Sequence, residues 1–494
     1  MTDRTSLDLD PEAMRELSEK ALALVTNYFN GIADLPVFPN TTAEELSARF
    51  DSTLPLEGES LESLFRACEK IIEGSRQNGH PRFFGYVASP ATPVGAFGDL
   101  IASALNANVT SWRSGPAATE IERTVVRWLG MLVGFAGAAH GLLTSGGSMA
   151  NLAALLMAHR ARSEVDTAAA GLWSAGAPMT IYASDQIHLS IKKAADILGL
   201  GRDQVRTVQS DSRLRFDIRR LRERIESDKR NGLRPFCVVA SAGTVSTGAI
   251  DPLAEVADVA EEHGLWFHVD GAYGAFGAMV DRKRELFTGI ERADSLSLDP
   301  HKWLYTPIDC GCVLFRDQDK ARAAFSTEAD YIKVQEQTET ESFAFWDYGP
   351  ELSRRFRALK LWMTLKHYGT RRLAEAIEHD ILMAEYMAEL VAADEEFELM
   401  APADLSICCF RYVPGALRKR LADADEKERA QVNSELDELN ARMMHAVQRG
   451  GLAYLSNASI GDRFALRACI TNFRTTRADI DATLEIVRDA ARAG

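Results

Sequence analysis

The chain has 494 residues, 46% of them hydrophobic and 26% charged, which is ordinary for a globular protein with more than one domain. Its net charge of −15 argues against nucleic acid as a partner, because phosphate binding needs a basic surface. We find no apolar run of membrane-spanning length and no basic segment followed by an apolar run at the start, so we expect a cytoplasmic protein with no membrane partner.

Residues 11–80 are expected to be mainly helical, because apolar side chains recur at helical spacing and prolines follow at 36 and 39. The recurring positions are Ala13, Leu17, Ala21, Leu24 and Tyr28. A segment of this kind has too little apolar surface to fold alone. We therefore expect it to pack on something else.

From about residue 84 to 370, short apolar runs alternate with helices. The expected strands cover 180–183, 236–240, 265–269, 295–298 and 310–315, and the expected helices include 151–160, 191–198 and 253–262. This alternation is typical of an α/β fold with a mostly parallel central sheet and helices on both faces. In such sheets, ligands bind at the carboxyl ends of the strands.

Residues 371–494 change character and predict a smaller α+β domain. A long helix comes first, strands are expected at 410–413 and 464–470, and a charged helix is expected around 423–448. The seven cysteines of the whole chain are scattered, and the close pairs at 310/312 and 408/409 lack the spacing of a zinc site. We interpret them as reduced core thiols and expect no metal.

A lysine stands directly after an expected strand, in the run SLDPHKW at 297–303. Partial desolvation there favours the neutral amine of Lys302, which can attack an aldehyde. The alternative is a lysine that lies along the apolar surface and reaches water with its amine. The run alone does not choose between the two.

Asp270 ends another expected strand, in WFHVDGAY at 266–273. A carboxylate there is unfavourable without a cationic partner, and a pyridinium nitrogen would be such a partner. The acid would keep that ring protonated, so that it can accept electrons, and the small Gly271 and Ala272 leave room for it. The alternative is a helix N-cap. The 32-residue interval to Lys302 fits one strand–helix–strand crossover, which would place both residues at one sheet edge.

The run TSGGSMAN at 144–151 opens an expected helix. Its glycines expose backbone amides, and a helix N-terminus favours phosphate, although most such turns are only turns. The run also lacks the lysine of a nucleotide-binding P-loop. His188 follows a further strand. Alone it is more often structural, but beside the other features we interpret it as a residue that stacks on a ring.

Together these segments resemble the group II pyridoxal-phosphate decarboxylases, the family of aromatic-L-amino-acid, tyrosine, histidine and glutamate decarboxylases. The resemblance keeps a consistent order from about residue 10 to 480. The matching runs are HPRFFGY at 80–86, SW at 111–112 with PAATE at 116–120, YASDQIH at 182–188, HVDGAY at 268–273, PHKW at 300–303, DYIK at 330–333 and RRFRALK at 354–360.

The resemblance implies a fold type I enzyme with pyridoxal 5'-phosphate as its cofactor. It implies an N-terminal helical dimerisation segment at 1–83, a large cofactor-binding domain at 84–370 and a small C-terminal domain at 371–494. The enzyme would be a homodimer with its active sites at the subunit interface.

The resemblance also assigns roles to individual residues. Lys302 would carry the cofactor as a Schiff base, Asp270 would pair with the pyridine nitrogen, and His188 and Ala272 would lie on the two faces of the ring. The remaining roles fall to Gly147, Ser148 and His301 at the phosphate, Thr244 at the cofactor site, Tyr86 and Arg467 at the substrate, and Tyr331 on a loop that closes over the neighbouring subunit's site.

Some positions depart from the family's pattern. Asp299 stands where animal members usually carry asparagine near the phosphate, so its role is open. Val87, Asn108 and Thr110 fall where larger apolar or aromatic side chains are expected. These three residues argue against a catechol pocket like that of the animal aromatic enzymes.

We expect decarboxylation of an L-amino acid, with an aromatic one as the first choice and glutamate, histidine or a diamino acid as alternatives. Tyr331 would be the general acid that protonates Cα after CO2 leaves. In related enzymes, phenylalanine at this place goes with aldehyde formation. The plainer interpretation of Tyr331 is a tyrosine on a surface loop. An aminotransferase or an aldehyde-forming oxidative deaminase would use the same lysine and aspartate, and a non-catalytic interaction protein is a remote alternative.

Overall fold

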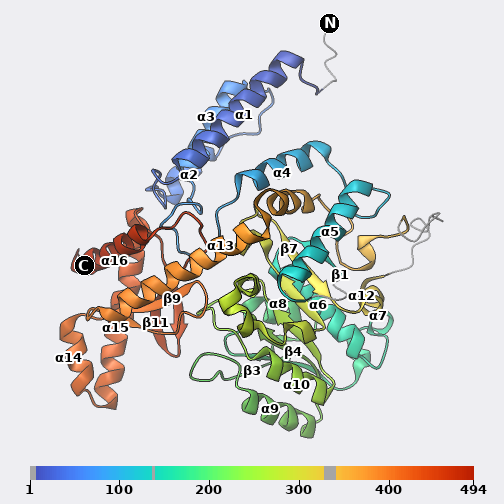
Figure 1. Ribbon diagram of the computed structural model, residues 1–494, viewed down its shortest axis with the longest axis vertical. Helices are drawn as coiled ribbons and strands as arrows, with labels where there is room; N and C mark the ends of the chain where they lie inside the picture. The colour runs from blue at the N-terminus through green and yellow to red at the C-terminus, as the bar shows by residue number, and fades with distance from the viewer. Residues whose placement is uncertain (1–6, 136–139, 327–340, 494) are drawn as a thin grey trace.

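The computed structural model describes residues 7–135, 140–326 and 341–493. In Figure 1, the first three helices extend away from the body of the molecule. The long helix α13 (Ala358–Ala393) runs from the large sheet-containing unit into a smaller C-terminal unit. None of the described helices is long and apolar enough to cross a membrane.

The N-terminal segment is mainly helical, as predicted. Its helices are α1 (Pro11–Gly31), α2 (Ala43–Phe50) and α3 (Leu61–Glu73). Asp10 fixes the start of α1, since its carboxylate accepts hydrogen bonds from two amides of the first turn at 3.0 and 2.9 Å. None of the residues in the three helices is buried. No apolar side chain of these three helices is therefore fully covered within one chain.

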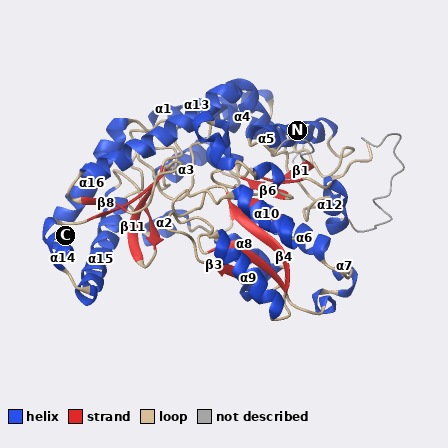
Figure 2. Cartoon of the chain, turned by 60° about the horizontal axis from the view of Figure 1, so that its bottom comes forward, coloured by secondary structure: helices blue, strands red, loops and turns tan. Residues whose placement is uncertain are grey.

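A seven-stranded, mostly parallel sheet forms the large unit, as predicted (Figure 2). Its strands are β1 (His140–Thr144), β2 (Met179–Ser184), β3 (Val205–Val208), β4 (Arg234–Ser241), β5 (Trp266–Asp270), β6 (Ser295–Leu298) and β7 (Gly311–Phe315), in the order β1-β7-β6-β5-β4-β2-β3. β7 runs antiparallel to both of its neighbours, and the remaining strands share one direction. Their carboxyl ends therefore meet at one edge.

Helices pack against this sheet. Those of the large unit are α4 (Pro93–Leu105), α5 (Pro116–Leu132), α6 (Gly147–Arg162), α7 (Thr167–Ala170), α8 (Leu189–Ile197), α9 (Ile218–Arg230), α10 (Leu253–His263), α11 (Pro300–Trp303) and α12 (Gln318–Phe325). α6 packs across β4, β5, β6 and β7, and α8 packs on α6. α9 and α10 pack against β3, β4 and β5. The start of α6 is thereby held at the carboxyl edge of the central strands.

The connection from β5 to β6 differs from the expected strand–helix–strand crossover. The two strands are parallel neighbours, and Asp270 lies opposite Ser297. However, three short 3-10 helices replace a single α-helix between them: η3 (Ala275–Met279), η4 (Asp281–Phe287) and η5 (Ile290–Arg292). The expectation that Asp270 and Lys302 share one sheet edge is nevertheless correct, because adjacency of the strands alone produces it.

The C-terminal unit has its own antiparallel sheet and its own apolar core. The strands β8 (Phe397–Leu399), β9 (Ile407–Tyr412), β10 (Ser456–Ile460) and β11 (Arg463–Cys469) are ordered β10-β11-β9-β8. The charged helix expected around 423–448 is α15 (Glu426–Gly450), which a shorter helix, α14 (Gly415–Asp423), precedes, and α16 (Arg477–Ala493) follows the sheet. α13 is broken at Gly369, where φ is 72°. The domain boundaries at 83 and 370 stay predictions.

Candidate active site

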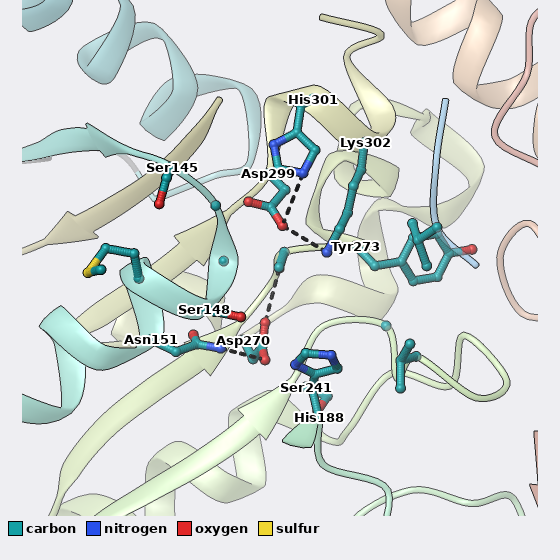
Figure 3. Close-up of a pocket in the computed structure, with 17 residues that line it drawn as sticks. Ser145, Ser148, Asn151, His188, Ser241, Asp270, Tyr273, Asp299, His301 and Lys302 are labelled. Atoms are coloured by element: carbon teal, nitrogen blue, oxygen red, sulfur yellow. Dashed lines mark hydrogen bonds and ion pairs between the residues drawn. The ribbon is translucent and has the colours of Figure 1, made fainter. Parts of the chain in front are cut away.

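A pocket of about 340 Å³ lies at the carboxyl ends of β4, β5 and β6, against the start of α6. This is the sheet edge at which the sequence predicts a ligand site. Figure 3 shows its polar side chains converging from separate elements. The lining residues are Val87, Ser145, Gly146, Gly147, Ser148, Met149, Asn151, His188, Ser241, Gly243, Val245, Asp270, Ala272, Tyr273, Asp299, His301 and Lys302.

The amine of Lys302 lies inside this pocket. Pro300 stands at the first position of the short helix α11, where its fixed φ favours helix initiation directly after β6. Lys302 Nζ lies 2.8 Å from Asp299 Oδ2, and the lysine side chain is 22% exposed (Figure 3). The amine therefore pairs with a buried carboxylate, and it does not extend to bulk water along an apolar surface.

The segment after Lys302 is hydrogen-bonded to the part of α13 that belongs to the C-terminal unit. The Trp303 indole N–H and the Tyr305 hydroxyl donate to Asp380 Oδ2 on α13, at 2.9 and 2.7 Å. The Trp303 ring also stacks on Tyr273, with 5.2 Å between centroids. Burial raises the pKa of Asp380 to about 8, although the two donors lower it. A buried carboxyl on another unit thus orders the residues that follow the lysine.

Asp270 presents a carboxylate with neutral partners only. It accepts hydrogen bonds from Asn151 Nδ2 at 2.9 Å, Ser297 Oγ at 3.1 Å and the Ala272 amide at 3.2 Å. No ion pair reaches Asp270 within the part of the chain that the structure describes, and the residue is 7% exposed. Asp270 does not cap an α-helix, because η3 starts only at Ala275. A pocket carboxylate of this kind suits a cationic group of a ligand.

Asn151 holds Asp270 through a buried chain of hydrogen bonds. Its Oδ1 lies 2.9 Å from His268 Nε2, and the other ring nitrogen, Nδ1, lies 2.9 Å from Ser295 Oγ. Burial lowers the pKa of His268 to about 4, so this ring is neutral. Since Asn151 Nδ2 donates to Asp270, its Oδ1 must accept the proton of Nε2, and the network assigns both the amide and the tautomer.

His188 is tied to the same network through Ser190. Asn151 Nδ2 donates to Ser190 Oγ at 2.9 Å, and Ser190 Oγ lies 2.8 Å from His188 Nδ1. His188 also caps α8, since its Nδ1 accepts from the Ser190 amide at 3.3 Å. Burial lowers the pKa of His188 and favours the neutral ring. His188 therefore caps a helix and also lines the pocket, and its stacking on a ring stays a prediction.

The opposite end of the pocket suits an anion. α6 starts at Gly147, and its N-cap, Gly146, provides no side chain to its first amides. A Cβ on Gly147 would lie 2.8 Å from Ala272 Cβ and 2.9 Å from Asp299 Oδ2, so this close approach requires glycine. Ser148 and His301 line the same end. The pocket around the Lys302 amine thus contains a carboxylate, Asp270, that suits a cation, and the N-terminus of α6, which suits an anion.

Sequence reasoning missed Asn151, although it lies within the glycine-rich motif. The signal in the sequence was an asparagine at the start of an expected helix that is otherwise rich in alanine and leucine, and its burial is known only from the structure. His268 and Ser297 were missed as well, because their neighbours can be known only after the strands are ordered.

Of the predicted site residues that the structure describes, three do not line the pocket: Tyr86, Thr244 and Arg467. Thr244 is buried and bonded to Thr247, between the lining residues Gly243 and Val245. Arg467 donates from Nη1 to the Tyr86 carbonyl oxygen at 2.7 Å, so these two predicted substrate residues lie together. Tyr331 lies outside the described residues. The roles assigned to the site residues stay predictions.

The three residues that depart from the family's pattern in the expected substrate region do not all line the pocket. Val87 lines the pocket, whereas Asn108 and Thr110 do not. Asn108 accepts a hydrogen bond from the Arg354 amide at 2.9 Å, and Thr110 is buried. In the described residues, no group of three His, Cys, Asp or Glu side chains is placed to hold a metal ion.

The fold and the pocket fit a pyridoxal-phosphate-dependent enzyme, in which Lys302 would offer an amine to the aldehyde, Asp270 a carboxylate to the ring nitrogen, and α6 its amides to the phosphate. The model of the pyridoxal-dependent decarboxylase conserved domain matches residues 43–413. The chain belongs to this family, as its resemblance predicted, and is a pyridoxal-phosphate-dependent amino-acid decarboxylase.

Individual relatives cover nearly the whole chain. An aromatic-L-amino-acid decarboxylase from Bacillus atrophaeus is 35% identical over 472 residues, covering 95% of this chain and 94% of the relative. A phenylacetaldehyde synthase from Petunia hybrida is 31% identical over 503 residues, covering 99% and 96%.

Solved structures agree over the same length. The crystal structure of mouse CSAD has a TM-score of 0.91 at 30% identity, covering 98% of this chain and 99% of that one. The crystal structure of Oryza sativa TDC with PLP and tryptamine has a TM-score of 0.89 at 29% identity, covering 99% of both. The fold type I architecture that the sequence predicts is confirmed.

Proposed function

We propose that the enzyme converts an aromatic L-amino acid to its amine and CO2, with Lys302 as the lysine that carries the cofactor. The observation that carries this proposal is the convergence of Lys302, Asp270 and the start of α6 on one pocket. When bound, pyridoxal phosphate supplies an electron sink for the bond that breaks at Cα.

The chain's own residues would hold and tune that group. Asp270, fixed by its three neutral donors, would keep the ring nitrogen protonated. His188 would lie against one face of the ring, and Ala272 would pack on the other. Gly147, Ser148 and His301 would hold the phosphate at the start of α6, and Thr244 would support the loop that carries Gly243 and Val245.

The aromatic substrate is supported by relatives and by the surroundings of Tyr86. The relative from Bacillus atrophaeus is named for aromatic L-amino acids, and Oryza sativa TDC was solved with tryptamine. Tyr86 is 53% exposed, and its ring lies 6.1 Å from that of Tyr454. This surface can accept an aromatic side chain. Arg467 is buried, and its Nη2 has no hydrogen-bond partner in the described residues, so it can serve a polar group of the substrate.

An amine product follows from the proposed role of Tyr331. A phenol at Cα can return a proton after CO2 leaves and complete simple decarboxylation. Since the similar chains include a phenylacetaldehyde synthase, the product must be measured along with the substrate. An aldehyde with ammonia and hydrogen peroxide is the alternative outcome.

We also propose a homodimer in the cytoplasm as the working form. α1, α2 and α3 contain no buried residue, and Met14 and Leu22 are 54% and 45% exposed. A second copy would cover these apolar side chains. Sedimentation would show a dimer as the smallest active species. Full activity from a monomer would refute the proposal.

A screen of L-amino acids tests the function directly. CO2 and amine are quantified from tyrosine, tryptophan, phenylalanine, glutamate, histidine and a diamino acid under the same conditions. We expect the aromatic substrates to have the highest kcat/KM. A preference for glutamate or a diamino acid would overturn the substrate assignment, and formation of keto acid without CO2 would overturn decarboxylation itself.

A further inference from the structure

A second carboxylate, Asp299, lies in the pocket beside the lysine. Asp299 is 2% exposed, and its Oδ2 lies 2.8 Å from Lys302 Nζ and 3.8 Å from His301 Nε2. Its other oxygen, Oδ1, is buried and has no hydrogen-bond partner in the described residues. The Lys302 ammonium is therefore the cation that balances this carboxylate.

Among the described residues, the groups around Asp299 supply no replacement for that cation. Burial lowers the pKa of His301, and its Nδ1 lies 2.8 Å from the Cys310 carbonyl oxygen, so the neutral ring keeps its proton on Nδ1 and turns an unprotonated Nε2 toward Asp299. Burial raises the pKa of the Cys310 thiol to about 12 and also raises the pKa of the Cys312 thiol, so both are neutral. Lys360, on α13, is paired with Asp99 at 3.0 Å.

We propose that Asp299 takes the ammonium proton of Lys302 when the amine joins the cofactor's aldehyde, and keeps it as a neutral acid while the cofactor is bound. The inference rests on the proposed role of Lys302. The proton crosses 2.8 Å from Nζ to Oδ2. The freed lone pair of Nζ bonds to the aldehyde carbon, and the aldehyde oxygen leaves as water with the two remaining amine hydrogens. Charge and atoms balance, and no oxidant or reductant is needed.

Electrostatics favour the neutral acid once the amine has reacted. The ammonium is then gone, and the phosphate would bring negative charge to the start of α6, where a Cβ on Gly147 would lie only 2.9 Å from Asp299 Oδ2. An ionised, buried carboxylate beside an anion is unfavourable, whereas a carboxylic acid can donate a hydrogen bond. His301 Nε2 lies 3.8 Å from Asp299 Oδ2. An asparagine at this position could not take up the proton.

Infrared difference spectroscopy tests the proposal without measuring turnover. Spectra of the full-length protein are recorded without cofactor and after loading with pyridoxal 5'-phosphate. We expect loading to produce the carbonyl band of a protonated carboxylic acid. 4'-Deoxypyridoxine 5'-phosphate, which has no aldehyde, should bind without producing this band, because Lys302 then remains an ammonium.

Asp299→Asn should lose the new band while it still binds the cofactor. The matched control is Asp317→Asn, because Asp317 pairs with Lys320 at the same spacing in an exposed position, at 3.0 Å. The control should keep the band. Circular dichroism and melting curves establish that both variants are folded.

Two results would overturn the inference. The first is the absence of an acid band in the loaded wild-type protein, or its persistence in Asp299→Asn. The second is a folded Asp299→Asn variant that binds neither compound, because Asp299 would then be needed for binding itself. Borohydride reduction followed by peptide mass spectrometry separates this failure from a failure of the proposed function: cofactor found on another lysine removes the premise, whereas cofactor on Lys302 without the band removes only the proton transfer.

Discussion

Replacing Asn151 with leucine tests whether the buried hydrogen-bond chain behind Asp270 serves the cofactor. The change keeps the approximate size of the side chain and removes its donor and its acceptor. Asp270 then loses one of its three hydrogen bonds, and the His268 N–H loses its acceptor. Ser190 also loses the donor through which it is tied to Asp270.

The expected loss of cofactor affinity follows from the bond to Asp270. A hydrogen bond to a charged group contributes about 1.5–3 kcal/mol, which corresponds to an affinity about 10- to 150-fold weaker. The orphaned His268 N–H adds a loss of stability of about 1–3 kcal/mol. Binding of pyridoxal 5'-phosphate to the cofactor-free variant is titrated by absorbance, and stability is followed by melting curves.

Asn440→Leu is the matched control. Asn440 is fully buried and also makes three hydrogen bonds, but they go to Tyr412 and Leu436 in the C-terminal unit. This control should lose stability and keep its cofactor affinity. If Asn151→Leu bound the cofactor as tightly as the wild type, Asn151 would be only a structural residue, and the argument that it orders the pocket would be wrong.

Three further predictions follow from the site. Asp270→Asn should lose about 100-fold or more in turnover, because a neutral amide cannot stabilise a protonated ring nitrogen, and near-normal turnover would contradict that role. Asp380 has a folded-state pKa of about 8, above the ordinary value for an aspartate, so it stabilises the fold at low pH and that contribution is lost as pH rises toward 8. Between pH 6 and 8 the melting temperature of the wild type should therefore fall by a few degrees relative to Asp380→Asn, and parallel curves would exclude this titration. Tyr331→Phe should keep the cofactor but shift the product from amine to aldehyde, ammonia and hydrogen peroxide in air, and an unchanged amine yield would remove Tyr331 as the acid.

The sequence predicted the parallel sheet and its ligand-binding edge mainly because β4 and β5 are dominated by apolar residues. β5 and β6 are buried at every position and end at chemically distinctive residues, Asp270 and the segment before Lys302. β1 and β3 were not predicted. β1 (HGLLT) and β3 (VRTV) are short and include polar residues or glycine, so neither has a clear strand period.

Local sequence patterns could not supply the tertiary partners of the site. Asp270, Lys302 and the glycine-rich turn were found because each combines a distinctive residue type with a strand or helix end. Asn151 and Asp380 act through contacts 119 and 77 residues away, respectively, which only the folded chain reveals. The contact between Arg467 and the Tyr86 backbone likewise joins the C-terminal unit to the segment before the large sheet.

The identity of the lysine that holds the cofactor is the most direct test of the account. The protein is loaded with pyridoxal 5'-phosphate, reduced with borohydride, digested and analysed by mass spectrometry, in parallel with Lys302→Ala. We expect the reduced cofactor on Lys302 in the wild type, and neither a reducible link nor turnover in the variant, because Lys302 places the amine inside the pocket. Cofactor attached to another lysine, or turnover that persists in Lys302→Ala, would contradict the assignment of this pocket as the active site.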